Sequence, residues 1–313
     1  MIFLQLILFL ASFVAIWFGA DLIVKSVIRF SKKLKISSFS ASFFILGFLT
    51  SMPEIALGLT AITSKNPDIF VGNLIGGVVV IFLLVFPVLA IMGKGVKISH
   101  ELNPFSLVFS LIVTAMPALL VIDHRVTNIE AIILIIFYIA LFYVIESKKG
   151  FLSANSIESD TAKKYSLIDL LKIISGMILI FVSSHYIVDQ TLYFSQFLHI
   201  PPLVISVIVL SFGTNLPELS LAVNSILSGH KEIAFGNYMG SAAANTFLFG
   251  VFSLINQGEV ITTNNFLVSF AFILIGMGLF FYFTRSKNDL SRKEGLLLFC
   301  LYILFVAYWL TFR

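Results

Sequence analysis

Two short stretches decide the fold of this chain: Leu49-Thr50-Ser51-Met52-Pro53-Glu54 and Gly213-Thr214-Asn215-Leu216-Pro217-Glu218. They lie 164 positions apart, and each places a glutamate directly after a proline inside a long apolar run. The same offset, without a gap, relates Gly72, Asn73 and Gly76 to Gly236, Asn237 and Gly240. A constant offset across both halves of a chain is typical of an internal repeat.

The apolar runs around these stretches have the length of membrane spans. Of the 313 residues, 59% are hydrophobic and 12% are charged, whereas soluble proteins average about 45–50% apolar and about 25% charged residues. Crossing the hydrocarbon layer takes about 20 apolar residues. Hydropathy therefore predicts an all-α membrane protein with ten transmembrane helices, at 2–27, 37–63, 68–92, 104–122, 127–146, 166–190, 200–227, 232–255, 264–284 and 294–312.

The repeat and the basic residues together predict the topology. Five spans in each copy make the second copy enter the membrane from the opposite side, so we predict two inverted five-helix repeats. These are residues 1–146 and 166–313, joined by a polar cytoplasmic linker at 147–165. Most of the 20 lysines and arginines fall in one set of alternate connections. The positive-inside rule places that set in the cytoplasm, so we expect a multi-pass protein of the plasma (inner) membrane with both termini outside the cytoplasm.

Glu54 and Glu218 are the deepest carboxylates in the predicted spans. A charged group at that depth is costly and usually marks an ion path. The alternative is a protonated glutamate that only forms hydrogen bonds between packed helices. Inverted repeats are common in secondary transporters, which bind substrate near the membrane midplane between the two halves. A duplication kept only for packing symmetry is the alternative. The two glutamates therefore indicate a cation path through the centre of the repeats.

Each glutamate shares one helical face with small polar residues. Carboxylates, hydroxyls and carbonyls are the oxygen ligands that hard cations prefer. Pro53 and Pro217 lack an N–H, so we expect them to free backbone carbonyls beside the carboxylates. The predicted ligand faces are Gly47, Thr50, Ser51 and Glu54 in the first copy and Ser211, Thr214, Asn215 and Glu218 in the second.

The third and eighth spans carry a second polar motif, Gly-Asn-x-x-Gly. The glycine pairs predict close packing between helices. In the eighth span Asn237, Ser241 and Asn245 follow at i, i+4 and i+8 on one face, whereas the equivalent positions of the third span are Asn73, Gly77 and Ile81. The sequence therefore predicts a lopsided site, with more oxygen ligands from the second half.

At these paired motifs the chain resembles the Ca²⁺/cation antiporter superfamily, specifically a bacterial or archaeal membrane protein of the Na⁺/Ca²⁺ exchanger type. The exchangers carry two repeats of G-T-S-x-P-E, each followed by G-N-x-x-G-S. The resemblance covers both halves. It implies a secondary cation antiporter that moves Ca²⁺, or a related cation, against Na⁺ or H⁺ by alternating access, with no cofactor.

The resemblance also implies roles for individual residues. Glu54 and Glu218 would hold the central metal cation, with Thr50, Ser51, Thr214 and Asn215 lining flanking Na⁺ sites and Ser241 and Asn245 contributing from the eighth span. Pro53, Pro217, Asn73 and Asn237 would support them.

The chain departs from the family pattern at Leu49, Gly77, Ile81 and Asn245, where oxygen ligands or a glycine are usual. These departures leave open a degenerate relative that is a monovalent cation/H⁺ exchanger, channel-like or non-transporting. An intramembrane enzyme is disfavoured because no Ser-His pair or metal-binding histidine group accompanies the two acids. We expect membrane lipid and inorganic cations as partners, no nucleic acid, and a monomeric chain.

Overall fold

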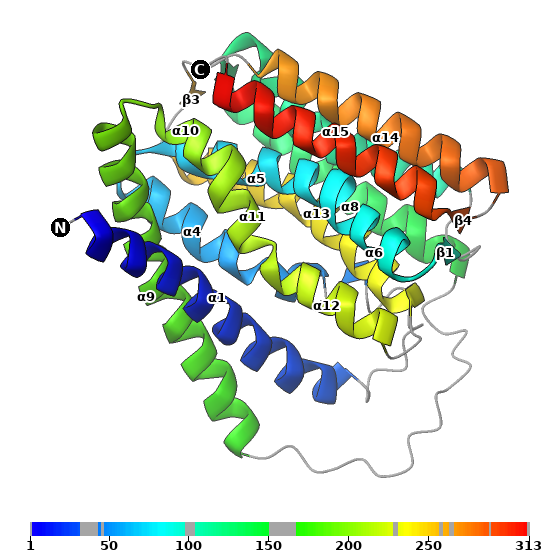
Figure 1. Cartoon of the computed structure of the whole chain (residues 1–313), viewed down its shortest axis with the longest axis horizontal. Coiled ribbons are helices and arrows are strands. Elements are labelled where there is room, and N and C mark those ends of the chain that lie inside the picture. Colours follow the sequence, from blue (N-terminus) through cyan, green and yellow to red (C-terminus); the bar gives the residue numbers. More distant parts are fainter. Residues whose placement is uncertain are drawn as a thin grey trace.

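The structure is a computed structural model, and it describes residues 2–31, 43–44, 47–97, 104–149, 167–227, 231–256, 259–262, 266–287 and 289–311. Within these residues, nine helices are long and apolar enough to cross a membrane, and the shorter apolar helix Met52–Thr63 lies in the remaining predicted span. The all-α architecture with ten spans agrees with the prediction from hydropathy. The helices run side by side in one bundle (Figure 1).

The first repeat begins with one long helix and continues with interrupted ones. Its elements are α1 (Ile2–Ser31), α3 (Gly47–Thr50), α4 (Met52–Thr63), α5 (Pro67–Val80), the π-helical η2 (Ile81–Val85), α6 (Phe86–Met92), α7 (Pro104–Leu120), the 3-10 turn η3 (Val121–Asp123) and α8 (Asn128–Lys149). Residues 37–42 and 45–46 of the predicted second span lie outside the described residues.

The second repeat has the same order of spans. Its elements are α9 (Leu167–Leu198), α10 (Pro202–Ile205), the π-helical η4 (Ser206–Leu210), α11 (Ser211–Thr214), α12 (Leu216–Leu227), α13 (Lys231–Ile255), α14 (Leu267–Lys287) and α15 (Arg292–Thr311). Its π-helical segment lies in the seventh span, however, and α13 runs unbroken where α5, η2 and α6 follow one another in the first repeat. The predicted linker at 147–165 begins inside α8, and its residues from 150 onward lie outside the described part of the chain.

The helix α9 is longer than hydropathy predicts. It continues to Leu198, whereas the apolar run ends near residue 190. Gln190 and Thr191 are buried, and the Thr191 hydroxyl donates to the carbonyl oxygen of Ile187 at 2.7 Å. Because its own helix accepts this hydrogen bond, a polar residue need not end the span.

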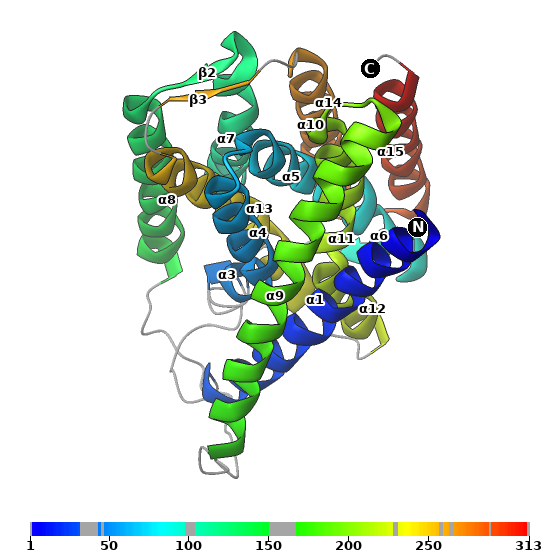
Figure 2. The ribbon, with the colours of Figure 1, turned by 90° about the vertical axis from the view of Figure 1, so that its left-hand side faces the viewer.

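The helices α5 and α13 form the centre of the bundle. Of the span that contains α5, 89% is buried, and of the α13 span 78%, whereas only 22% of α8 and of α15 is buried. α5 packs against α4 of its own repeat and against η4, α11 and α13 of the other. Figure 2 shows α1 and α9 crossing on one side of this centre. The two central helices therefore lie between the repeats.

Two short antiparallel strand pairs connect the repeats and reveal their symmetry. β1 (Val96–Lys97) pairs with β4 (Asp289–Leu290), and β2 (Arg125–Val126) pairs with β3 (Val260–Ile261). The offset of 164 residues turns β1 into β3 and β2 into β4, and it converts the pair Val96 and Leu290 into the pair Val260 and Val126. The two ladders lie at opposite ends of the bundle (Figure 1). This arrangement is the one that an inverted repeat produces.

Candidate functional site

The second and seventh spans are each broken at the predicted motif. α3 ends at Thr50 and α4 begins at Met52, and Ser51 between them has φ −80° and ψ 8°. The equivalent Asn215 separates α11 from α12 with φ −86° and ψ 9°. The proline of each motif follows as the second residue of the new helix, where a missing N–H leaves no hydrogen bond unmade. The repeat has thus kept the same backbone break in both copies.

The two glutamates stand in the first turn of the helices that follow the breaks. Their side chains are 1% and 0% exposed, and Glu54 lies within electrostatic range of Glu218. The N-terminal end of a helix carries a partial positive charge, which favours a carboxylate there. The breaks therefore bring two acids together in the interior at helix ends that stabilise negative charge.

The long central helices contact these breaks across the repeats. The Thr214 hydroxyl donates to Asn73 Oδ1 at 3.1 Å, and Thr50 Oγ1 lies 3.4 Å from Asn237 Oδ1. Thr214 also approaches Glu54, and Thr50 approaches Glu218. Each predicted supporting asparagine thus contacts the threonine of the opposite repeat. These contacts hold the broken helix of one repeat against the long helix of the other.

One side of the site contains a chain of hydroxyl groups. Ser241 Oγ on α13 donates to Glu218 Oε1 at 2.9 Å and lies 3.4 Å from Ser51 Oγ. Ser51 Oγ in turn donates to the carbonyl oxygen of Gly47 at 2.8 Å. All of these side chains are buried. We call Ser51, Ser241 and Glu218 the serine flank.

A second group of contacts contains amides around a glycine. A Cβ on Gly77 would lie 2.9 Å from Asn245 Nδ2 and 3.2 Å from Asn215 Nδ2. Asn215 Nδ2 donates to the carbonyl oxygen of Ser211 at 2.7 Å, and Asn245 Nδ2 to that of Leu74 at 3.5 Å. We call Gly77, Asn215, Asn245 and Glu54 the amide flank.

Several buried oxygens of this cluster accept no hydrogen bond from the residues that the structure describes. Burying such an atom without a partner is costly, most of all when it belongs to a carboxylate. A cation or ordered water would satisfy them, and oxygen is the ligand that hard cations prefer. The atoms are both carboxylate oxygens of Glu54, Oε2 of Glu218, and Oδ1 of Asn215 and of Asn245.

The predicted ligands Gly47 and Ser211 lie at helix crossings. A Cβ on Gly47 would lie 2.7 Å from the backbone of Gly240, and a Cβ on Gly76 would lie 2.8 Å from the Ser211 side chain. Ser211 Oγ donates to the carbonyl oxygen of Val207, within its own span. Gly47 and Ser211 therefore meet the site through backbone carbonyls, which accept from Ser51 and Asn215.

Tyr238 is a buried neighbour that the motif reasoning missed. Its side chain is fully buried on α13, it lies within electrostatic range of Glu218, and its hydroxyl has no hydrogen-bond partner among the described residues. Its equivalent in the first repeat is Leu74. In the sequence, the position of Tyr238 directly after Asn237 could have indicated that its hydroxyl lies near the site.

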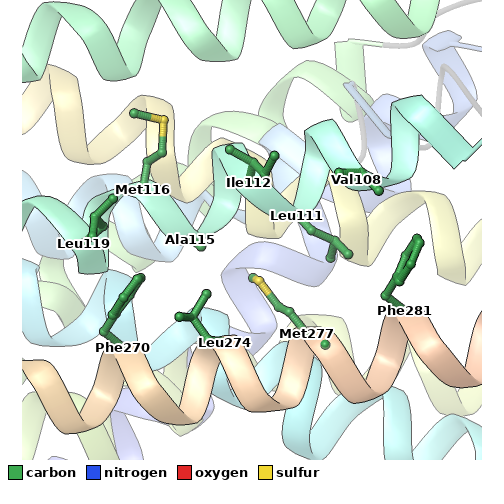
Figure 3. Close-up of a pocket in the computed structure, with 11 residues that line it drawn as sticks. Val108, Leu111, Ile112, Ala115, Met116, Leu119, Phe270, Leu274, Met277 and Phe281 are labelled. Atoms are coloured by element: carbon green, nitrogen blue, oxygen red, sulfur yellow. The ribbon is translucent and has the colours of Figure 1, made fainter.

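A separate groove between α7 and α14 lacks the chemistry for a cation. It has a volume of about 440 Å³ and is lined only by apolar residues, among them Leu111, Met116 and Met277 (Figure 3). A cation there would lose its water without gaining an oxygen ligand. The groove is therefore not part of the polar cluster between the repeats.

Comparison with known proteins relates this arrangement to one family. The family described as sodium/calcium exchanger protein matches residues 4–145 and 169–311. An uncharacterized membrane protein of Methanocaldococcus jannaschii is 25% identical and covers 96% of both chains. The sodium/calcium exchanger MaX1 of Methanosarcina acetivorans is 23% identical over 98% of this chain and 99% of its own.

Solved structures share the fold. A structure of the sodium-calcium exchanger NCX_Mj, soaked with Na⁺ and Sr²⁺, superposes with a TM-score of 0.70 at 24% identity. The match covers 98% of this chain and 99% of that one. The two chains therefore have the same architecture over their whole matched length.

Proposed function

This chain belongs to the sodium/calcium exchanger family, and we propose that its cations bind at the buried cluster around Glu54 and Glu218. It is a multi-pass membrane protein and a secondary cation antiporter of the sodium/calcium exchanger type, not an enzyme. The proposed exchange moves Ca²⁺, or a related cation, against Na⁺ or H⁺.

One observation carries the assignment of the site: two carboxyl groups are fully buried at equivalent helix breaks, and three of their four oxygens lack a hydrogen-bond partner among the described residues. Two negative charges in a low-dielectric interior are costly unless a positive charge compensates them. One divalent cation between Glu54 and Glu218 would neutralise both. The oxygens of Thr50, Ser51, Thr214 and Ser241 stand within the same buried cluster and supply further ligands.

The symmetry of the repeats supports alternating access as the mechanism. Inverted-repeat transporters move one repeat against the other around a fixed site near the midplane. Here each broken helix contacts the central helix of the opposite repeat, through Thr214 and Asn73 and through Thr50 and Asn237. We further propose a monomer in the plasma membrane with both termini outside the cytoplasm, divided at the linker into repeats 1–146 and 166–313.

Exchange by the chain reconstituted into lipid vesicles tests the proposal. We expect Glu54→Gln and Glu218→Gln each to reduce Na⁺-driven Ca²⁺ uptake about 100-fold or more, because each removes half of the compensating charge. Glu259→Gln is the matched control, since Glu259 is partly exposed and pairs with Arg125 outside the site. Wild-type uptake in both site variants, with a folded protein, would contradict the proposal.

A second candidate function rests on the amide flank. Gly77 has no side chain, and Ile81, the equivalent of Asn245, is buried in η2 without an oxygen to offer. Fewer ligands favour a monovalent cation/H⁺ exchanger, or a channel-like or non-transporting relative. Removing the cation on the opposite side of the membrane distinguishes these, because an exchanger stops whereas a channel continues to conduct.

A further inference from the structure

The repeat makes the serine flank and the amide flank equivalent positions. The offset of 164 residues relates Ser51 to Asn215, Gly77 to Ser241 and Glu54 to Glu218. In each flank one residue comes from a helix break, and a glutamate and the residue at position 77 or 241 come from the opposite repeat. The amide flank has Asn245 in addition, whose equivalent is Ile81. The residues of each pair are also neighbours in space: the Ser51 and Ser241 hydroxyl oxygens are 3.4 Å apart, and Asn215 Nδ2 lies 3.2 Å from where a Cβ of Gly77 would be.

The hydroxyl protons of the serine flank are already used. A serine hydroxyl has one proton to donate and two lone pairs. Ser51 donates to Gly47 at 2.8 Å and Ser241 to Glu218 at 2.9 Å, both shorter than the 3.4 Å between the two hydroxyl oxygens. The Ser51 and Ser241 oxygens therefore face each other with lone pairs, beside a carboxylate. Two such oxygens and a negative charge are the ligands of a hard monovalent cation.

The amide flank presents the opposite polarity. Asn215 Nδ2 lies 2.7 Å from the Ser211 carbonyl oxygen, which can only accept, so the amide nitrogen is the atom on that side. Asn245 Nδ2 makes a longer contact of 3.5 Å to the Leu74 carbonyl oxygen, from α13 to α5. Both nitrogens lie about where the side chain of residue 77 would stand. Amide N–H groups carry partial positive charge, so they oppose a cation at the place next to Gly77, and we assign the two amide oxygens, which have no hydrogen-bond partner among the described residues, to the central cation between the glutamates.

From this contrast we infer that only the serine flank takes a monovalent cation such as Na⁺, and that the amides of Asn215 and Asn245 have closed the equivalent position at Gly77. The inference rests on the proposed function and concerns the number of coupling ions at the same site. One flanking position instead of two lowers the number of monovalent ions that the chain can bind beside its glutamates. The amide groups of Asn215 and Asn245 occupy the position of a second coupling ion.

Equivalent substitutions in the two flanks test the inference. We would measure ²²Na⁺ equilibrium binding to the purified full chain and the Na⁺ concentration for half-maximal Ca²⁺ exchange in vesicles. We expect Ser51→Ala and Ser241→Ala to weaken Na⁺ binding about tenfold, which is the effect of one lost contact to a charge. We expect Asn215→Ala, the counterpart of Ser51→Ala, to change Na⁺ binding by no more than about twofold, whatever its effect on the maximal rate.

Because Asn215→Ala also removes the bond to Ser211, Asn215→Ser is the second variant. A serine already occupies the equivalent break at residue 51 with nearly the same backbone angles, so this variant keeps the fold. Na⁺ binding that is unweakened in Asn215→Ser supports the inference. Weakening as large as in Ser51→Ala, in either Asn215 variant that melts like the wild type, overturns it.

The glutamate variants separate this test from that of the proposed function. If Glu54→Gln and Glu218→Gln are inactive while the Ser51 and Asn215 variants weaken Na⁺ binding equally, the inference about the flanks is wrong and the cation site stands. If both glutamate variants exchange normally, the proposed function is wrong. Direct Na⁺ binding reports on the flanks in either case.

Discussion

Glu218 and Glu54 hold equivalent positions, yet their neighbours differ. Glu218 accepts a hydrogen bond of 2.9 Å from Ser241, whereas neither oxygen of Glu54 accepts one from the described residues. Where Ser241 stands beside Glu218, the first repeat has Gly77. The difference teaches that the duplication has preserved the position of the acid in the backbone and has not preserved the group that contacts it.

The backbone is more symmetric than the site. The helix breaks at Ser51 and Asn215 have φ and ψ values within a few degrees of each other, and the two strand ladders follow the same offset. Backbone geometry is constrained by hydrogen bonds and by proline, which any functional copy must keep. Side chains can change one at a time, so the two flanks can diverge on an unchanged scaffold.

The largest difference in stability that we expect is between alanine substitutions at two glycines of the central helices, Gly240 and Gly77. A Cβ on Gly240 would overlap the backbone carbonyl of Phe43, so Gly240→Ala should lower the free energy of unfolding by about 3 kcal/mol. On Gly77 a Cβ meets only the ends of two amide side chains, which can rotate, and the helix preference of alanine over glycine, about 1 kcal/mol, offsets this contact, so Gly77→Ala should cost about 1 kcal/mol or less. Thermal unfolding in detergent measures both. Equal losses would show that the amides are as immovable as backbone.

A smaller effect distinguishes the two contacts between the repeats. Thr214→Val should lower the free energy of unfolding by about 1 kcal/mol, because it removes a 3.1 Å hydrogen bond to Asn73 of the other repeat. Thr50→Val should lower the free energy of unfolding by less, because it removes a weaker contact between the repeats. The Thr50 hydroxyl lies 3.1 Å from the carbonyl oxygen of Gly47 in its own helix and 3.4 Å from Asn237 Oδ1. Unfolding curves of both variants measure the difference.

Thr191→Val is the control for this pair, because it removes a buried hydroxyl that bonds only within its own helix in the described structure. If Thr50→Val costs more than Thr214→Val, the shorter contact is not the stronger one, and the assignment of the two bonds is wrong.

The smallest effect concerns Tyr238, which stands where the first repeat has Leu74. Its buried hydroxyl has no partner among the described residues, so Tyr238→Phe should leave stability unchanged or raise it by up to about 1 kcal/mol. The melting temperature of the two proteins checks this. A loss of stability would reveal a bond to the hydroxyl, for instance through water near Glu218.

Much of the fold was predictable because its causes are local. An apolar run of about 20 residues demands a span wherever it occurs, and Pro53 and Pro217 predict a disturbed helix because proline has no N–H. The π-helical segments Ile81–Val85 and Ser206–Leu210 were not predicted, since nothing in their apolar sequences distinguishes them from α-helix. The two-residue strands were also not predicted, because two residues are too few to show a periodicity.

The candidate site was predictable as a set of residues and not as a set of contacts. The offset identified Asn73 and Asn237 as equivalent, and only the structure places each one at the threonine of the opposite repeat. The lopsided ligands were expected from Gly77 and Ile81. The convergence of Asn215 and Asn245 on Gly77 was not expected, because both amides reach a residue of the other repeat.

The sequence by itself determined the spans, the inverted repeat, the two buried glutamates and the helix breaks beside them, because each depends on residues that are neighbours along the chain. The tertiary structure alone decided which oxygens and amides face one another. Contacts such as Ser51 with Ser241 or Thr214 with Asn73 join residues 190 and 141 positions apart. They exist because the two inverted copies pack their central helices against each other's breaks, and that packing depends on the shape of the whole bundle.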